Sequence, residues 1–397
     1  MAAELRVGVI GLGRAGAGML SALAKHPDIR VTAAADLHGT HLDRFRAEFE
    51  GLAFNDAEGL CRSPEVDAVY IATPHELHAR HVAAAAENGK HIIVEKPMAL
   101  TLAGCDRMIE VTEAAGVQMV VGHTASFNPG VQKMREIIMG GEAGELGMIS
   151  ATAYTDFLYR PRRPEELVTE LGGGIIFNQV PHQVDAARYL AGGMARSVRA
   201  AAWTLDPKRP TEGCYMALLE FAGGAAASLV YSGYDHFDSA DLAASRGPRS
   251  AEQYGAARRA LAGVQSADEE VAMRISTGYG GPNVRGGRGE VSMLQGELGA
   301  FIVSCDRADL RLVPEGVAVY SNDGLRVVAP NPWRGVPGRG NVIDELYFAI
   351  TEGRPLVHDG RWAKATMEVC LAVLESARGH REIDLEHQVP VRAEAEG

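Results

Sequence analysis

A run of three glycines, Gly172 to Gly174, precedes polar residues that have a helical spacing. In one continuous helix, Asn178, His182 and Asp185 would share a face, because they stand four and three residues apart. A neutral histidine on such a face can take up a proton near pH 7. Glycines permit a left-handed backbone and a close approach to a ligand. We predict that this stretch is catalytic; the alternative is a buried histidine satisfied by Asn178 or Asp185.

A glycine motif near the start of the chain is the second candidate site. The motif G-x-G-x-x-G directly follows the apolar run at 5–10 and precedes a helical pattern that extends to about Ala24. In this strand–turn–helix setting the motif binds a dinucleotide, because backbone N–H groups and the helix dipole hold the pyrophosphate. The residues predicted to bind the cofactor here are Gly11, Gly13, Arg14, Ala15 and Gly16.

A carboxylate after the second predicted strand indicates which dinucleotide is bound. Residues 29–35 read as a strand, and Asp36 stands 20 residues after Gly16. A carboxylate there can bind both hydroxyls of the adenosine ribose and repel a 2′-phosphate. Neither Leu37 nor His38 is the arginine that usually accompanies a 2′-phosphate. The predicted cofactor is NAD, with NADP as the alternative.

Two further apolar runs, at 67–72 and 90–94, are typical of buried parallel strands and end in polar residues. In such folds ligands bind at the carboxyl edge of the sheet. The residues predicted to bind the cofactor at these strand ends are Thr73, Pro74, His75, His78, Glu95, Lys96 and Pro97. Lys96 is also a candidate for catalysis and substrate binding, and the alternative is a solvated charge.

The three histidines at 75, 78 and 81 suggest a metal cluster at first sight. No cysteine or carboxylate pattern completes a ligand set, however, and His-Glu-Leu-His is not the zinc motif H-E-x-x-H. We interpret them as a helix start beside the cofactor cleft and predict no metal.

Three arginines lie within four positions just before the glycine run, at Arg160, Arg162 and Arg163. Arginine binds carboxylates through two parallel hydrogen bonds, so the cluster predicts an anionic substrate. The alternative is a solvated loop neutralised by nearby acidic residues, which are Glu165, Glu166 and Glu170.

Length and composition favour a globular chain of two domains. With 397 residues the chain is too long for one compact core, and a net charge of −12 argues against nucleic acid or an anionic membrane as partner. No apolar run is long enough to span a bilayer, and the first residues lack the form of a signal peptide. Five scattered cysteines suit reduced thiols, so we expect a cytoplasmic protein.

The pattern of elements divides the chain at about residue 123. About six parallel strands with intervening helices, among them 102–115, predict a Rossmann domain over 1–123. Residues 124–397 predict an α+β domain on a largely antiparallel open sheet, with helices at 129–139, 341–352 and 361–379. Its expected strands are 146–157, 197–204, 214–221, 225–233, 299–304, 308–313, 317–320 and 325–328. A glycine-rich insert near 235–292 is expected to be mobile or to face a partner.

Taken together, these motifs resemble the glucose–fructose oxidoreductase/inositol dehydrogenase/MocA family (Gfo/Idh/MocA). The marks are the glycine motif, Thr73-Pro74 with His78, Glu95-Lys96-Pro97, and the three glycines that lead to His182 and Asp185. The resemblance implies a cleft in which Lys96 meets the reacting hydroxyl, with His182 as the catalytic histidine. It also implies a homodimer or homotetramer formed through the open sheet.

One residue departs from the family pattern. The family usually has Asp four residues before the histidine, where this chain has Asn178, and an amide cannot take up a proton. The segments Arg160-Pro-Arg-Arg-Pro, 174–183 and 303–311 are most similar to phthalate 4,5-cis-dihydrodiol dehydrogenases. The function implied is hydride transfer to NAD from a small anionic cyclic diol in aromatic-acid catabolism. Lys96 would polarise the oxygen, His182 accept the proton and Asn178 position the substrate. The alternatives are a sugar or inositol dehydrogenase and a non-catalytic NAD-sensing regulator.

Overall fold

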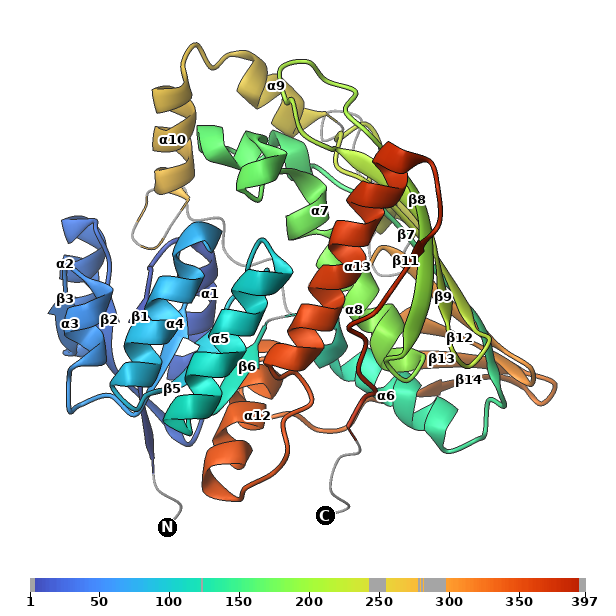
Figure 1. Ribbon diagram of the computed structural model, residues 1–397, viewed down its shortest axis with the longest axis horizontal. Coiled ribbons are helices and arrows are strands. Elements are labelled where there is room, and N and C mark those ends of the chain that lie inside the picture. The colour runs from blue at the N-terminus through green and yellow to red at the C-terminus, as the bar shows by residue number, and fades with distance from the viewer. Residues whose placement is uncertain are drawn as a thin grey trace.

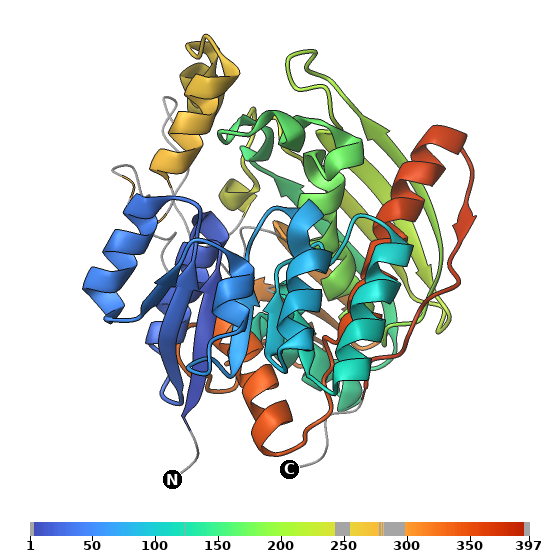
Figure 2. The same ribbon diagram turned by 60° about the vertical axis from the view of Figure 1, so that its left-hand side comes forward.

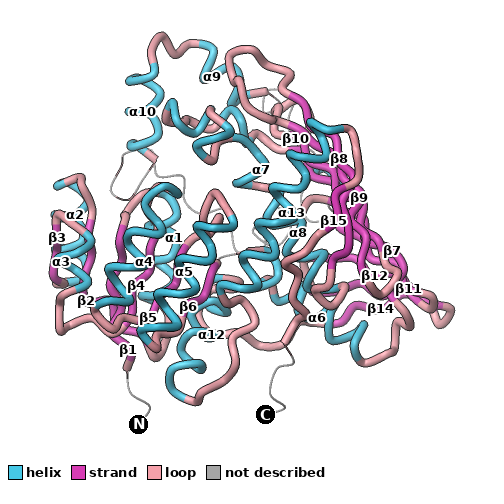
Figure 3. Tube along the Cα trace, in the orientation of Figure 1, coloured by secondary structure: helices cyan, strands magenta, loops and turns pink. Residues whose placement is uncertain are grey.

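The computed structural model describes residues 4–122, 124–242, 255–277, 279, 281 and 298–392. It contains two sheets, and Figure 3 shows their strands on opposite sides of the molecule with helices between them. One sheet is parallel and the other is mostly antiparallel, which confirms the predicted fold class. None of the described helices is both long enough and apolar enough to cross a membrane.

The first sheet is parallel and has the strand order β3-β2-β1-β4-β5-β6. Its strands are β1 (Leu5–Ile10), β2 (Ile29–Ala35), β3 (Leu52–Phe54), β4 (Ala68–Ile71), β5 (His91–Val94) and β6 (Met119–Val121). The connecting helices are α1 (Arg14–Ala24), α2 (Gly39–Phe49), α3 (Ala57–Cys61), α4 (His78–Glu87) and α5 (Leu102–Ala115). The direction of winding reverses between β1 and β4, so the loops after these strands border the crevice where such sheets bind ligands.

Helix α12 (Arg339–Thr351) returns from late in the chain to cover one face of this sheet, as Figures 1 and 2 show. Its residues Val342, Ile343 and Leu346 are buried in one cluster with residues of α1 and α2, whereas α3, α4 and α5 pack in the other cluster. The domain division at residue 123 stays a prediction. The structure nevertheless packs α12 on the first sheet, because its apolar residues complete the cover of that face.

The second sheet has nine strands in the order β14-β13-β12-β11-β7-β10-β9-β8-β15. All neighbours are antiparallel except β7 and β10. The strands are β7 (Leu146–Tyr154), β8 (Ala195–Trp203), β9 (Cys214–Phe221), β10 (Ala226–Ser232), β11 (Ala300–Cys305), β12 (Ala308–Val313), β13 (Gly316–Ser321), β14 (Gly324–Val328) and β15 (Ile383–Asp384). The helices packed on its inner face include α6 (Pro129–Met139), α8 (Val180–Leu190) and α13 (Gly360–Gly379).

Three details differ from the expected pattern. Strand β7 ends at Tyr154 rather than at 157, because the Thr155 hydroxyl accepts a hydrogen bond of 3.1 Å from the Phe157 N–H and turns the chain. The sixth parallel strand is β3, whose three residues are too few to show a periodic pattern. The insert contains α9 (Ala256–Ala262) and α10 (Ala267–Ser276), while most of its glycine-rich part lies outside the described residues.

A buried polar network ties four segments of the chain together. The Ser126 hydroxyl, in a 3₁₀ helix at Ala125–Phe127, donates to the Asp185 carboxylate and lies 2.7 Å from Nε2 of His358. The other oxygen of Asp185 accepts from Trp362 Nε1 at 2.7 Å, and Nδ1 of His358 lies 2.6 Å from Glu345. Burial alone would lower the pKa of His358, but Glu345 and Asp185 outweigh it, so the pKa is raised.

This raised pKa predicts a pH-dependent contribution to stability. A histidine whose pKa is raised by folding stabilises the protein fully below its unfolded pKa of about 6.5, and that contribution is lost as pH rises through the folded pKa. We expect His358→Gln to lower the free energy of unfolding by about 1–3 kcal/mol at pH 6. The difference from the wild type should shrink as pH rises above 6.5 in urea titrations. A difference that grows with pH would contradict a charged His358.

Candidate active site

The glycine motif forms a tight turn between β1 and α1. Gly11 has φ +93°, and a Cβ atom there would lie 2.8 Å from the carbonyl oxygen of Ala72. A Cβ atom on Gly16 would lie 1.8 Å from the Gly11 oxygen, so the helix and the turn are in direct contact. A Cβ atom on Gly13 would meet nothing within 4 Å, which leaves room for a phosphate group. The predicted Arg14–Ala15 pair then begins α1 beside this open position.

The Asp36 carboxylate stands next to the same turn. One oxygen accepts a hydrogen bond of 2.6 Å from the Leu12 N–H, inside the glycine motif. The other accepts from the His38 N–H at 2.8 Å and lies 3.2 Å from Nδ1 of His41. These contacts orient the carboxylate beside the dinucleotide turn, which is where a ribose-binding group is needed.

The predicted cofactor residues after β4 hold two loops together. Thr73 and Pro74 follow the strand, and the ring nitrogens of His78 lie 3.0 Å from the carbonyl oxygens of Thr73 and Pro97. Nδ1 of His81 lies 3.0 Å from the Thr73 hydroxyl. Among the residues that the structure describes, no group of three or more His, Cys, Asp or Glu side chains is placed to hold a metal ion. The hydrogen bonds of His78 hold the loop after β4 against the loop after β5.

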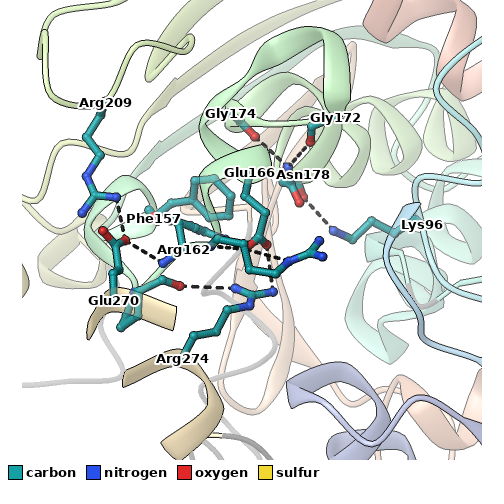
Figure 4. A network of polar contacts seen from close by, with 12 residues as sticks. Lys96, Phe157, Arg162, Glu166, Gly172, Gly174, Asn178, Arg209, Glu270 and Arg274 are labelled. Carbon is teal, nitrogen blue, oxygen red and sulfur yellow. Dashed lines mark hydrogen bonds and ion pairs between the residues drawn. The ribbon is translucent and has the colours of Figure 1, made fainter. Parts of the chain in front are cut away.

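Lys96 reaches from the end of β5 to the other half of the molecule. The Glu95 carboxylate before it is partly buried and accepts from the Tyr70 hydroxyl at 2.5 Å, and burial raises its pKa. The Lys96 ammonium group donates a hydrogen bond of 2.8 Å to the main-chain carbonyl oxygen of Asn178, as Figure 4 shows. A strand end of the first sheet is thus joined directly to the glycine-rich segment.

The prediction of one continuous helix after the glycines is wrong. The structure has a short helix, α7 (Gly174–Asn178), and then α8, with Gln179 between them in a non-ideal conformation. Pro181 explains the break, because it lacks an N–H and its ring clashes with the preceding turn of a helix. Asn178 ends the first helix, and His182 lies in the first turn of the second.

Two of the three glycines have a left-handed backbone, and the surrounding protein lies close to them. Gly172 and Gly174 have φ +86° and +74°. A Cβ atom on Gly172 would lie 2.9 Å from Nδ1 of His75, so this turn packs against the cofactor domain. The Asn178 amide donates to the carbonyl oxygens of Gly172 and Gly174 at 3.0 and 2.8 Å, and it thereby holds the turn.

His182 is 2% exposed, and its pKa is lowered, which favours the neutral imidazole. Burial lowers its pKa well below the ordinary value, the positive charges of Lys96 and Arg160 lower it further, and Asp185 opposes them. The hydrogen bonds of the Asp185 carboxylate go to Ser126 and Trp362. The imidazole is therefore in the form that can accept a proton, while the two cations make it a weaker base than an ordinary histidine.

The three predicted arginines have different surroundings. Arg160 pairs with Asp156 at 3.0 Å, and its charge reaches His182. Arg162 is buried; its guanidinium group lies 4.0 Å from the centre of the Phe157 ring and donates to the Phe157 carbonyl oxygen at 2.6 Å. Burial lowers the pKa of Arg162 to about 9.

Arg163 and its neighbours show that the solvated-loop alternative is partly right. Arg163 lies 3.7 Å from Glu166 and 3.9 Å from Glu76. Of the three acidic residues expected to neutralise the loop, Glu166 makes ion pairs with its arginines, while Glu170 pairs with Arg378.

Helix α10 of the insert adds charged residues that the sequence did not single out. Arg274 of this helix pairs with Glu166 at 2.8 Å, and Glu270 pairs with Arg209 at 2.7 Å, as Figure 4 shows. Arg274 stands more than 100 positions from the arginine loop, so no local pattern connects them.

Comparisons with known proteins agree with this geometry. Residues 5–123 match a family model described as an oxidoreductase family with an NAD-binding Rossmann fold, and residues 131–247 match the model of the GFO/IDH/MocA C-terminal domain. The chain is 38% identical over 379 residues to 1-carboxy-3-chloro-3,4-dihydroxycyclohexa-1,5-diene dehydrogenase of Comamonas testosteroni. That alignment covers 94% of this chain and 95% of the relative.

Solved structures show the same fold. A putative dehydrogenase from Bordetella bronchiseptica RB50 has a TM-score of 0.89 and 44% identity, with 96% of this chain and 100% of that one covered. The WlbA dehydrogenase from Bordetella pertussis, solved with NADH and UDP-GlcNAcA, has a TM-score of 0.68 at 20% identity, with 96% and 99% covered. The chain therefore belongs to the Gfo/Idh/MocA family of oxidoreductases, whose first domain is an NAD-binding Rossmann fold.

Proposed function

We propose that the protein oxidises a carboxylated cyclic cis-diol with NAD. The observation that carries this proposal is that Lys96, at the end of β5, donates to the carbonyl oxygen of Asn178, four residues before His182, and that its charge lowers the pKa of His182. The name of the Comamonas relative describes a ring with one carboxylate and two hydroxyls. The cationic groups around the site, among them Arg160 and Arg163, suit such an anion.

Each protein group has a defined task in this reaction. NAD supplies the hydride acceptor when it is bound. Lys96 polarises the reacting hydroxyl, and His182 accepts its proton at a ring nitrogen. Asn178 acts as a positioning residue, since its carbonyl oxygen holds the Lys96 ammonium group and its amide holds the glycine turn. Oxidation of a cis-dihydrodiol ends in an aromatic ring, so a weak acid–base apparatus suffices.

Substrate turnover tests the proposal. A carboxylated cis-dihydrodiol, the analogue without the carboxylate and myo-inositol are each assayed with NAD by nicotinamide absorbance. We expect the highest kcat/KM for the carboxylated diol. Preference for myo-inositol would favour a sugar or inositol dehydrogenase, and no turnover of any diol would favour a regulator.

Cofactor preference should follow Asp36. We expect the wild type to prefer NAD, and Asp36→Ser to narrow the preference by removing the charge that repels a 2′-phosphate. The measurement is kcat/KM with NAD and NADP for both proteins. A wild type that uses NADP tenfold better than NAD would show that Asp36 does not select the cofactor.

We also propose a cytoplasmic homodimer or homotetramer. The side chains of Met148, Met216, Leu218, Ile302 and Val327 are exposed on strands of the second sheet, opposite the residues buried beneath its helices. An apolar surface of this kind is typical of a subunit interface. The five free cysteines suit a reducing compartment. Sedimentation velocity tests the assembly.

A further inference from the structure

Helix α10 lies in the chain between β10 and β11. It packs against the arginine loop, which is the segment that holds Arg160, Arg162 and Arg163 beside the candidate active site. Glu270 accepts hydrogen bonds from the Arg162 N–H at 2.6 Å and from Arg209 at 2.7 Å. Arg274, one turn later, donates to the carbonyl oxygen of Pro161 at 3.2 Å. Figure 4 shows Glu270 and Arg274 reaching the loop from the same helix. The insert thus packs against the segment that carries the predicted substrate-binding arginines.

Three guanidinium groups surround a single carboxylate at this contact. Glu166 lies 2.8 Å from Arg274, 3.7 Å from Arg163 and 3.8 Å from Arg162. The side chains of Arg274 and Arg163 are 37% and 30% exposed, so a ligand can reach them. Arg163 also lies 3.9 Å from Glu76, and Glu270 pairs with Arg209, so four arginines face three carboxylates and one positive charge remains to favour a further carboxylate.

The cluster lies beside the predicted cofactor loop after β4, because Arg163 lies 3.9 Å from Glu76. The pKa of His75 is lowered by burial first, then by His78, and also by the charges of Lys96, Arg163 and Arg274. These cations therefore lie close to a histidine of the predicted cofactor loop. Burial lowers the pKa of Arg274, while 37% of its side chain stays exposed.

We propose that Arg274 is a specificity-determining residue that binds the carboxylate of the substrate. In the free enzyme Glu166 occupies this carboxylate-binding site, which is called the receptor below, and the substrate carboxylate displaces Glu166 when it binds. The inference rests on the proposed function and names the groups that select its substrate. A substrate carboxylate can replace Glu166 against Arg274 and Arg163 through charge-assisted hydrogen bonds. The affinity for an anion then depends on how readily Glu166 is displaced.

This competition predicts opposite effects for the two partners. Arg274→Ala removes a guanidinium group and should weaken anion binding by at least about tenfold, the loss expected for one hydrogen bond to a charged group. Glu166→Gln removes the internal competitor and should tighten anion binding severalfold. If Glu166 only held the loop in place, its removal would weaken anion binding.

The experiment measures binding to the NAD-saturated enzyme by calorimetry. Phthalate is the anionic probe and cis-1,2-cyclohexanediol the neutral one. The variants are Arg274→Ala, Arg274→Lys and Glu166→Gln. Arg361→Ala is the charge-matched control, because Arg361, at the start of α13, pairs with Glu113 of α5. We expect Arg274→Lys to restore part of the phthalate affinity, the control to change nothing, and diol binding to stay constant throughout.

The proposal is overturned if Arg274→Ala leaves phthalate binding within about threefold of the wild type, or if Glu166→Gln weakens it. A variant in which α10 no longer docks would lose affinity for phthalate without being rescued by lysine, and this too would overturn the assignment. The proposed function is tested separately, because diol turnover with NAD does not depend on the receptor. If the enzyme oxidises diols with NAD but its affinity for phthalate is the same in all variants, the receptor is refuted and the proposed function stands.

Discussion

Replacing Lys96 by alanine should lower kcat by at least about 100-fold while NAD still binds, because general acid–base groups contribute about 10² to 10⁴ in rate. The lysine ammonium group is held at the site by the Asn178 carbonyl oxygen. Steady-state kinetics with saturating NAD measure the loss, and fluorescence titration with NADH measures cofactor binding. Lys364→Ala is the matched control, since Lys364 pairs with Asp106 on α5.

His182→Ala should behave in the same way as the lysine variant. Because only the neutral imidazole can accept a proton, the acid limb of the kcat/KM profile should lie below the ordinary histidine pKa of about 6.5. Near-normal kcat in a cofactor-saturated His182→Ala protein would make His182 a structural residue. An acid limb above pH 7 would contradict the effect of burial and of the Lys96 charge.

The largest effect on stability is expected at Asp185. Its carboxylate is 1% exposed and accepts hydrogen bonds from the Ser126 N–H, the Ser126 hydroxyl and Trp362. Asp185→Ala leaves these donors without their acceptor and removes a charge that stabilises protonated His358, so we expect a loss of about 3–5 kcal/mol in the free energy of unfolding. Urea denaturation measures it.

A second aspartate provides the comparison for this loss. Asp359 caps α13 by accepting from the Trp362 N–H at 2.9 Å, and removal of such a cap costs about 1 kcal/mol. Asp359→Ala should therefore destabilise the protein less than Asp185→Ala. If Asp185→Ala kept its stability but lost 100-fold in kcat, the carboxylate would belong to catalysis and not to the fold.

Local sequence signals predicted most strands of the first sheet well. Glycines with a required backbone conformation, such as Gly11, and apolar runs such as 5–10 carry their structural reason in the residues themselves. Pro181 indicates the break between α7 and α8, because proline disfavours a continuous helix. The i, i+4, i+7 spacing of the polar residues favours one helix instead, and the structure follows the proline.

Contacts between distant segments could not be read in the same way. Asp185 shares a helical face with His182 in sequence spacing, yet its hydrogen-bond partner Trp362 stands 177 residues away. Arg274 reaches Glu166 only because α10 folds back on the arginine loop. Charge and hydrogen-bond partners of this kind depend on tertiary packing, for which a single sequence holds no periodic signal.

The return of α12 has a consequence for engineering. A fragment that ends near residue 123 would lack α12, the helix that packs with Met19, Leu23 and Val120. The cofactor-binding part therefore cannot be moved to another protein as one continuous segment. A chimaera that grafts this unit from another dehydrogenase must exchange two pieces of the gene, one from each end.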